Sequence, residues 1–199
     1  MEGLVQNYRI ESLIAQNLNK RIEVYLAKNA TNQRVVLKTH LTEYPPLKDV
    51  VQLEHEFHVL QKLDLKEVVQ PIELIHAKNH LYLALEFIEG VTLKAFIQEQ
   101  TKLDLKTFYI IAIQLVTILD KVHQHKIIHK DFNPTNLMIN PKTLNVRLID
   151  FSLASELAYE VSSTKLEGSL DYLSPEQTGR TSRITDFRSD FYSLGITFF

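Results

Sequence analysis

The spacing of apolar residues changes at Gly90, and this change constrains the fold more than any other feature of the chain. Between residues 20 and 87 the apolar residues occur in short or alternating runs bounded by turn residues, a pattern typical of β-strands. After Gly90 they recur at helical spacing. Residues 104–123 carry apolar side chains on more than one face, which predicts a central, largely buried helix. Strands followed by helices predict an α+β fold with two lobes.

Four short runs make up the strand-rich half of the chain. Residues 21–27 and 34–39 flank a turn with two asparagines, which tolerate tight-turn backbone angles, so these runs predict a hairpin. Residues 72–77 and 81–87 predict a second hairpin that turns at residues 78–79. The strands should therefore pair in an antiparallel sheet.

One helix is expected among these strands, because apolar residues recur at helical spacing over about residues 47–63. We expect an N-terminal β lobe with one helix over residues 1–89 and a mainly helical C-terminal lobe over residues 90–199, with a binding site between them. Residues 190–199 look like the start of a buried helix and end without a cap or polar tail. The chain is therefore expected to be a fragment, truncated after the start of this central helix.

The overall composition excludes several classes of function. The 22 basic and 24 acidic residues give no electrostatic case for binding nucleic acid. Cysteine is absent, so disulfides and thiolate metal sites are excluded. No apolar run approaches the roughly 18 residues of a membrane span, and the N-terminus lacks a signal-peptide pattern. We expect no membrane segment in these residues and a cytoplasmic location.

Asp131, Asn136 and Asp150 carry the strongest chemical signal. Asp131 and Asn136 lie five residues apart in the segment I-I-H-K-D-F-N-P-T-N, and Asp150 directly follows an apolar strand end. A carboxylate can orient a hydroxyl group and accept its proton, and carboxylate and amide oxygens suit Mg²⁺. The set therefore predicts phosphoryl transfer, with Asp131 as the catalytic base and with Asn136 and Asp150 as metal ligands.

Lys38 ends an apolar strand and is a candidate cation for nucleotide phosphates. A carboxylate on the following helix would hold its ammonium group in place. Glu54 and Glu56 both qualify, but Glu56 shares the face of Leu53 and Leu60 at helical spacing. We therefore predict a Lys38–Glu56 pair.

These segments resemble the protein kinase family. H-K-D-F-N-P-T-N resembles the kinase H-R-D-L-x-x-x-N, Asp150-Phe151-Ser152 resembles D-F-G, and Val35-Val36-Leu37-Lys38 resembles V-A-I-K. The resemblance implies a bilobal kinase-like fold, ATP and Mg²⁺ as cofactors, and a protein substrate phosphorylated on Ser or Thr. It also implies a set of residues that contact the nucleotide: Val24, Lys38, Leu85, Glu86, Ile88 and Glu89.

A later block resembles the kinase activation segment. Residues 168–176 read G-S-L-D-Y-L-S-P-E, similar to G-T-x-x-Y-x-A-P-E. A small-molecule phosphotransferase would have no use for this peptide-binding segment, which counts against that alternative. In the resemblance Asp190 binds the backbone of the catalytic loop. The segment also contains three candidate phosphorylation sites: Ser162, Ser163 and Thr164.

The glycine-rich loop that normally covers the triphosphate is missing. Asn17, Asn19 and Ile22 occupy the three glycine positions, and β-branched Ile22 disfavours positive φ. These departures keep open a second function, a pseudokinase module that regulates attached domains with weak or no ATP turnover. Three further positions depart from the kinase pattern: Lys130, Asn133 and Ser152.

The combination of H-K-D-F-N-P-T-N, S-P-E-Q-T-G-R and D-F-R-S-D-F-Y-S-L-G-I-T-F is similar to one bacterial family. Its members are large hybrid proteins in which a serine/threonine kinase-like domain precedes an AAA-type ATPase region, a GAF domain and a sensor histidine kinase. The resemblance implies a role in bacterial signal transduction. It also implies that the ATPase and histidine kinase domains follow in the same full-length chain.

Overall fold

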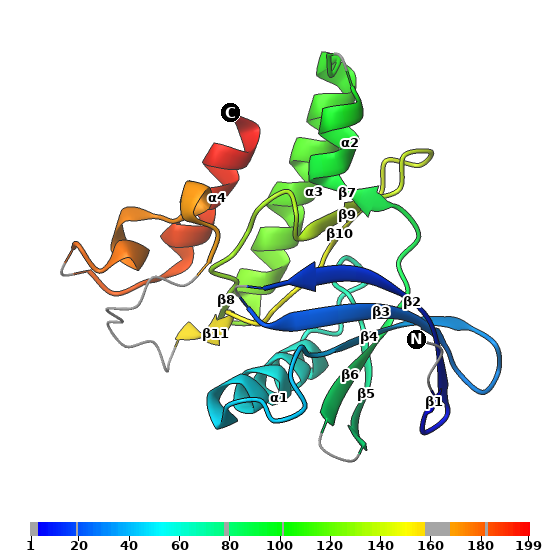
Figure 1. Ribbon diagram of the computed structural model, residues 1–199. Helices are drawn as coiled ribbons and strands as arrows, with labels where there is room; N and C mark the ends of the chain where they lie inside the picture. The colour runs from blue at the N-terminus through cyan, green and yellow to red at the C-terminus, as the bar shows by residue number, and fades with distance from the viewer. Residues whose placement is uncertain (1–3, 19, 78–79, 101, 158–167, 182) are drawn as a thin grey trace. The chain divides into compact units, whose positions relative to one another are not determined.

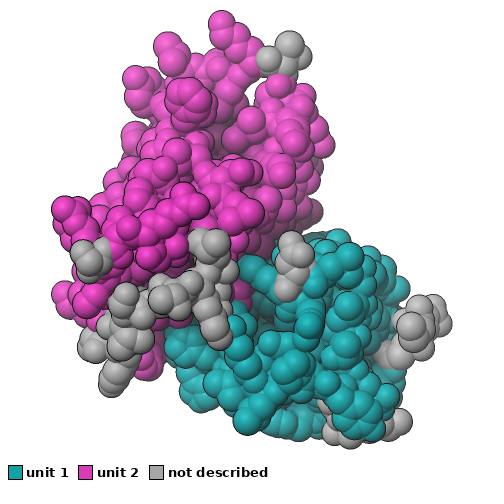
Figure 2. All heavy atoms as spheres, turned by 60° about the vertical axis from the view of Figure 1, so that its left-hand side comes forward, with its two compact units in different colours: residues 1–61, 69–88 teal, residues 62–68, 89–199 magenta. Residues whose placement is uncertain are grey.

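The computed structural model describes residues 4–18, 20–77, 80–100, 102–157, 168–181 and 183–199. The chain forms two compact units, coloured separately in Figure 2. Unit 1 contains Met1–Gln61 and Val69–Ile88, and unit 2 contains Lys62–Val68 and Glu89–Phe199. The lobe boundary predicted at residue 89 stays a prediction.

Unit 1 is built on a six-stranded antiparallel sheet in the order β1-β2-β3-β4-β6-β5 (Figure 1). Both predicted hairpins are present, as β3–β4 and β5–β6. The turn predicted at residues 78–79 lies outside the described residues. The strands have the following bounds: β1 Leu4–Val5, β2 Tyr8–Asn17, β3 Ile22–Lys28, β4 Arg34–His40, β5 Pro71–Ala77 and β6 His80–Glu86.

The predicted helix is α1, Leu47–Lys62, and it lies beside the sheet (Figure 1). It buries Leu53, Val59 and Leu60, which share a face at helical spacing. Glu56 lies on the same buried face. A carboxylate at such a position needs a partner, because burying an unpaired charge is costly.

The described residues of unit 2 include three α-helices with side-chain caps at their first turns. Thr92 accepts a hydrogen bond from Ala95 N at 3.2 Å and begins α2, Leu93–Glu99. Asp104 accepts from Thr107 N at 3.0 Å and begins α3, Leu105–Gln124, so both helices start at a side-chain cap. The third helix is α4, Phe187–Phe198. The short 3₁₀ helices η2, Leu170–Tyr172, and η3, Pro175–Thr178, precede it.

The helix α3 is less buried than the sequence predicts. Leu115, Leu119 and Val122 line a buried face as expected. Ile113, however, is 65% exposed and Ile110 is 37% exposed, so the prediction of a largely buried helix is wrong for that face. An apolar face of a helix is buried only where another part of the chain packs against it, so the apolar side chains of α3 do not by themselves predict burial.

No helix in the described part of the chain is long and apolar enough to cross a membrane.

Short strands frame the loop between residues 129 and 136. β8, Ile127–Ile128, directly precedes this loop and pairs with β11, Ser155–Glu156. β9, Leu137–Ile139, directly follows the loop and pairs with β10, Val146–Leu148, and with β7, Val91–Thr92. The loop is thus fixed at both ends by backbone pairing. This arrangement, a curled antiparallel sheet followed by helices, confirms the predicted α+β fold class.

Candidate active site

Lys38 and Glu56 meet inside unit 1. The Lys38 Nζ lies 2.9 Å from Glu56 Oε1 and 2.7 Å from Oε2, and the two side chains are only 8% and 0% exposed. β4 places the lysine and the inner face of α1 places the glutamate. Glu54 is half-buried on a different part of the helix. The structure therefore brings together the predicted pair and leaves Glu54 out of it.

The positions predicted to contact the nucleotide occupy different environments. Val24 on β3 pairs with Lys38 on β4, and Leu85 is buried in β6. The Glu86 carboxylate accepts a hydrogen bond from Gln70 N at 2.7 Å, which fixes the end of β6. Ile88 belongs to unit 1 and is half-buried, whereas Glu89 belongs to unit 2 and is exposed. Their contact with a nucleotide stays a prediction.

The segment without glycines forms the end of the β2–β3 hairpin. Asn17 and Ile22 pair directly across the two strands, so neither occupies a loop. The Asn17 Oδ1 accepts a hydrogen bond from Lys20 N at 2.9 Å, and Arg21 has a φ of 53°. The strained backbone therefore falls on Arg21 and not on Ile22. Asn19, at the remaining glycine position, lies outside the described residues.

Asp131 is held by donors on both carboxylate oxygens. Its Oδ1 accepts from Ser169 N and from Asn133 Nδ2, each at 3.0 Å. Its Oδ2 accepts from Asn136 Nδ2 at 3.1 Å. Donors on both oxygens restrict rotation of the carboxylate and hold it in one orientation.

The two predicted metal ligands flank a pair of hydrogen-bonded strands: Asn136 directly precedes β9, and Asp150 lies shortly after β10. Ile149 N donates to Asn136 O at 2.8 Å, so Asp150 follows directly from a residue bonded to Asn136. Asn136 uses its Nδ2 on Asp131, which directs the amide nitrogen and not the oxygen toward that carboxylate. An amide oxygen and a carboxylate are the hard donors that Mg²⁺ prefers, so these residues fit the implied metal.

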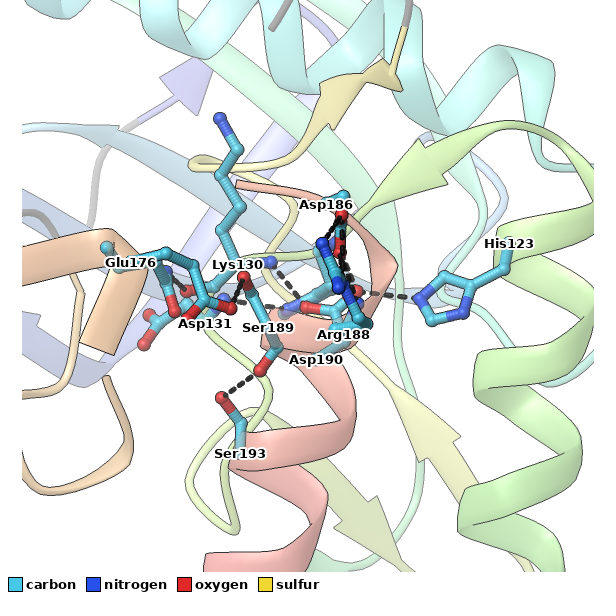
Figure 3. A network of polar contacts seen from close by, with 11 residues as sticks. His123, Lys130, Asp131, Glu176, Asp186, Arg188, Ser189, Asp190 and Ser193 are labelled. Carbon is cyan, nitrogen blue, oxygen red and sulfur yellow. Dashed lines mark hydrogen bonds and ion pairs between the residues drawn. The ribbon is translucent and has the colours of Figure 1, made fainter. Parts of the chain in front are cut away.

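Asp190 on α4 fixes the start of the candidate catalytic loop, residues 129–136 (Figure 3). Its carboxylate is fully buried and accepts from His129 N at 2.9 Å and from Lys130 N at 2.8 Å. It also lies 2.8 Å from His123 Nε2 on α3. Lys130 adopts a left-handed φ of 65°, and its side chain extends away from Asp190 in Figure 3. The predicted backbone role of Asp190 is confirmed.

His129 is fully buried beside three acids of the same unit. Burial lowers the pKa of its imidazole, although Asp190, Asp131 and Asp150 act in the opposite direction. Burial is the larger effect, because desolvation disfavours the charged form of the ring. The ring packs edge-on against Phe151 with 4.8 Å between centroids, so it contributes apolar packing under the loop.

The block from Gly168 to Gln177 is attached to the same loop. Gln177 Nε2 donates to Lys130 O at 2.8 Å while its Oε1 accepts from Ser174 N at 3.2 Å. Glu176 accepts from Ser189 Oγ on α4 at 2.6 Å, so this acid has a partner within the chain (Figure 3). The sequence reasoning missed Gln177 and Ser169. The three predicted phosphorylation sites, Ser162, Ser163 and Thr164, lie outside the described residues.

Comparisons with known proteins agree on one family. Residues 21–199 match the family model described as "Protein kinase domain". The chain is 30% identical over 180 residues to the serine/threonine-protein kinase PrkC of Bacillus subtilis, covering 88% of this chain and 27% of that protein. It is 31% identical over 153 residues to the probable serine/threonine-protein kinase PknB of Lactococcus lactis, covering 75% and 24%.

A eukaryotic relative is similarly close. The serine/threonine-protein kinase nekl-2 of Caenorhabditis elegans is 27% identical over 176 residues, covering 84% of this chain and 49% of that protein. The chain thus spans between about a quarter and a half of these relatives' lengths. With the family model covering nearly all of its residues, the chain belongs to the protein kinase family.

Proposed function

We propose that the protein transfers the γ-phosphoryl group of Mg·ATP to Ser or Thr hydroxyl groups of a protein substrate. The observation that carries this proposal is Asp131, whose carboxylate is held at both oxygens beside Asn136 and the Asp150 segment. A buried Lys38–Glu56 pair supports it, because it preorganises a cation for phosphate oxygens. The Ser/Thr specificity follows the relatives, whose names describe serine/threonine kinases.

Each residue has one task in this proposal. Lys38 holds phosphate oxygens and Glu56 holds Lys38. Asn136 and Asp150 hold Mg²⁺, which when bound neutralises charge on the phosphates. Asp131 orients the substrate hydroxyl and accepts its proton.

The adenine and ribose would be bound by residues of β3, of β6 and of the segment that directly follows β6. In the proposal Leu85 lies behind the adenine, and Glu86 and Ile88 offer it backbone groups. Glu89 contacts the ribose, and Val24 covers the base. The support is the fixed end of β6, where Glu86 and Gln70 exchange two hydrogen bonds.

A second candidate function is a pseudokinase regulatory module that binds nucleotide with weak or no turnover. The β2–β3 hairpin favours it, because Asn17 and Ile22 pair as strand residues and present side chains in place of glycine backbone. Glycine normally lets backbone amides approach the phosphates closely.

We also propose a setting for the activity. The motifs from residue 127 onward support a place in a hybrid bacterial signalling protein, followed by an AAA-type ATPase region, a GAF domain and a sensor histidine kinase. The bacterial relatives are several times longer than this chain, which is compatible with further domains. The proposed location is the cytoplasm, where ATP is available.

The test is transfer of labelled phosphate from ATP to protein by the full-length protein. Asp131→Asn and Asp150→Asn together should abolish transfer, and Glu56→Gln should lower it strongly. Glu54→Gln is the matched control, because Glu54 lies on the same helix outside the Lys38 pair. Transfer that survives the double substitution would contradict the proposal. Stabilisation by Mg·ATP without transfer would favour the regulatory module.

A further inference from the structure

Asn133 lies between the catalytic loop and the block that begins at Gly168. Its side chain is buried, with the residue 1% exposed. Its Nδ2 lies 2.9 Å from Asp131 O, 3.0 Å from Asp131 Oδ1 and 3.1 Å from Ser169 Oγ. Its Oδ1 accepts from Thr135 N at 2.9 Å and also from Thr135 Oγ1. One amide therefore joins Asp131, Thr135 and Ser169.

This arrangement uses the whole hydrogen-bonding capacity of the amide. A side-chain amide has two N–H donors and an oxygen with two lone pairs. Three acceptors share the two donors of Asn133, and two donors from Thr135 occupy its oxygen. No group of Asn133 is left to contact a substrate, and a saturated buried amide is a rigid link.

The link controls one oxygen of the Asp131 carboxylate. Asn133 Nδ2 and Ser169 N both donate to Oδ1, while Asn136 Nδ2 donates to Oδ2. Ser169 is 38 residues away in sequence, so its distance from Asp131 depends on how the later block is held. Asn133 bonds both partners and so fixes that distance.

Neither aspartate nor lysine at position 133 would make the same set of hydrogen bonds. Aspartate has no donors when ionised and would place a second carboxylate beside Asp131. Lysine has three donors but no acceptor, so it would leave the two Thr135 groups without their partner. An amide of this length fits the donors and acceptors that surround it.

We infer that Asn133 is a positioning residue for phosphoryl transfer: it orients the Asp131 carboxylate and couples it to Ser169 through a neutral amide. The inference rests on the proposed function, in which Asp131 orients the substrate hydroxyl. Because its amide is neutral, Asn133 supplies no positive charge to the transferred phosphoryl group. Asn133 acts on the reaction only through Asp131.

A double-substitution experiment on the full-length protein tests this route of action. Asn133→Ala should lower kcat for phosphate transfer by about 10- to 100-fold, since a small misplacement of a reacting group can cost about 10²-fold. KM for ATP should stay within about twofold, because Asn133 is not expected to touch the nucleotide. In an Asp131→Asn background Asn133→Ala should cause no further loss. Equal losses in both backgrounds, or an unchanged kcat in the first, would overturn the inference.

Asn140→Ala is the matched control. Asn140 is also an asparagine that caps a turn of unit 2, accepting from Lys142 N and Thr143 N, and both of these partners lie outside residues 129–136. Its substitution should leave kcat unchanged. If Asn133→Ala does not unfold cooperatively, Thr135→Val replaces it, because Thr135 is exposed and its loss removes one donor to the same amide.

Hydrogen exchange separates failure of this inference from failure of the proposed function. In wild-type protein the Ser169 amide donates to Asp131, so its exchange should be protected. Asn133→Ala should speed that exchange by about tenfold or more, whether or not phosphate is transferred. Absence of transfer in the wild type would sink the proposed function alone. An unchanged Ser169 exchange rate in the variant would sink the role of Asn133.

Discussion

The buried Lys38–Glu56 pair permits a quantitative prediction about stability. The glutamate is fully buried and the lysine side chain is 8% exposed, so neither charge can return to water when its partner is removed. Removing one partner of a buried pair typically costs about 3–5 kcal/mol, because the other charge is left without compensation. Lys38→Met and Glu56→Leu should therefore each lower the free energy of unfolding by about that amount.

The double variant distinguishes this explanation from a simple loss of contacts. If the two losses added, Lys38→Met/Glu56→Leu would lose about 6–10 kcal/mol, comparable to the whole stability of a domain. Replacing both charges by apolar groups of similar volume is instead often neutral or stabilising by about 1–4 kcal/mol. We expect the double variant to be at least as stable as the wild type and to transfer no phosphate.

Urea unfolding of the four proteins provides the measurement, with free energies from linear extrapolation. The interaction energy of the cycle should be at least about 5 kcal/mol, since two large single losses would vanish in the double variant. Additive losses would refute the reasoning. They would mean that solvent reaches the pair and that its burial does not determine its energy. A Glu54→Leu variant should show no coupling to Lys38→Met.

The remaining predictions concern titration, the Asp190 contacts and a helix cap. Burial lowers the pKa of His40, as it does that of His129, so the unfolded chain takes up protons first as pH falls below about 6.5. Stability should therefore decrease from about pH 6.5 downward, and His40→Leu should reduce that slope in urea unfolding at pH 7.5 and 5.5. Asp190→Asn should cost at least about 3 kcal/mol, because one carboxylate accepts two backbone donors and contacts His123; thermal unfolding measures it, and a loss below 1 kcal/mol would contradict it. Asp104→Ala should lower the melting temperature only slightly in the same assay, since it removes an exposed N-cap, and a loss as large as that of Asp190→Asn would contradict that reading.

Local patterns predicted most of the regular elements, and the exceptions have physical causes. The hairpins and α1 follow from alternation and helical spacing of apolar residues. β2 escaped prediction because most of its side chains are exposed, so its sequence shows little alternation. It is fixed by pairing with β3, which includes two irregularities in register. Strand pairing of this kind depends on the neighbour and is weakly encoded in the strand itself.

Local patterns likewise predicted some residues of the candidate site and missed the contacts of others. Glu56 could be chosen over Glu54 because helical periodicity defines a buried face. The bonds of Asn133 could not be foreseen, since they join it to Ser169, 36 residues further along the chain. The sequence alone showed only that Asn133 departs from the kinase pattern. The structure adds that the Asn133 amide makes its own hydrogen bonds, to Asp131, Thr135 and Ser169, which only the folded backbone brings together.

The hydrogen bonds to Asp190 have a consequence for how the protein is made. His129 and Lys130 depend on a carboxylate that follows them by 61 and 60 residues. During synthesis, which proceeds from the N-terminus, the catalytic loop emerges before its acceptor exists. Its two backbone donors must remain solvated until α4 has been made and has docked. The loop therefore reaches its final geometry late, so a ribosome-bound chain that ends before residue 190 should lack an ordered catalytic loop even where the sheet of unit 1 has already formed.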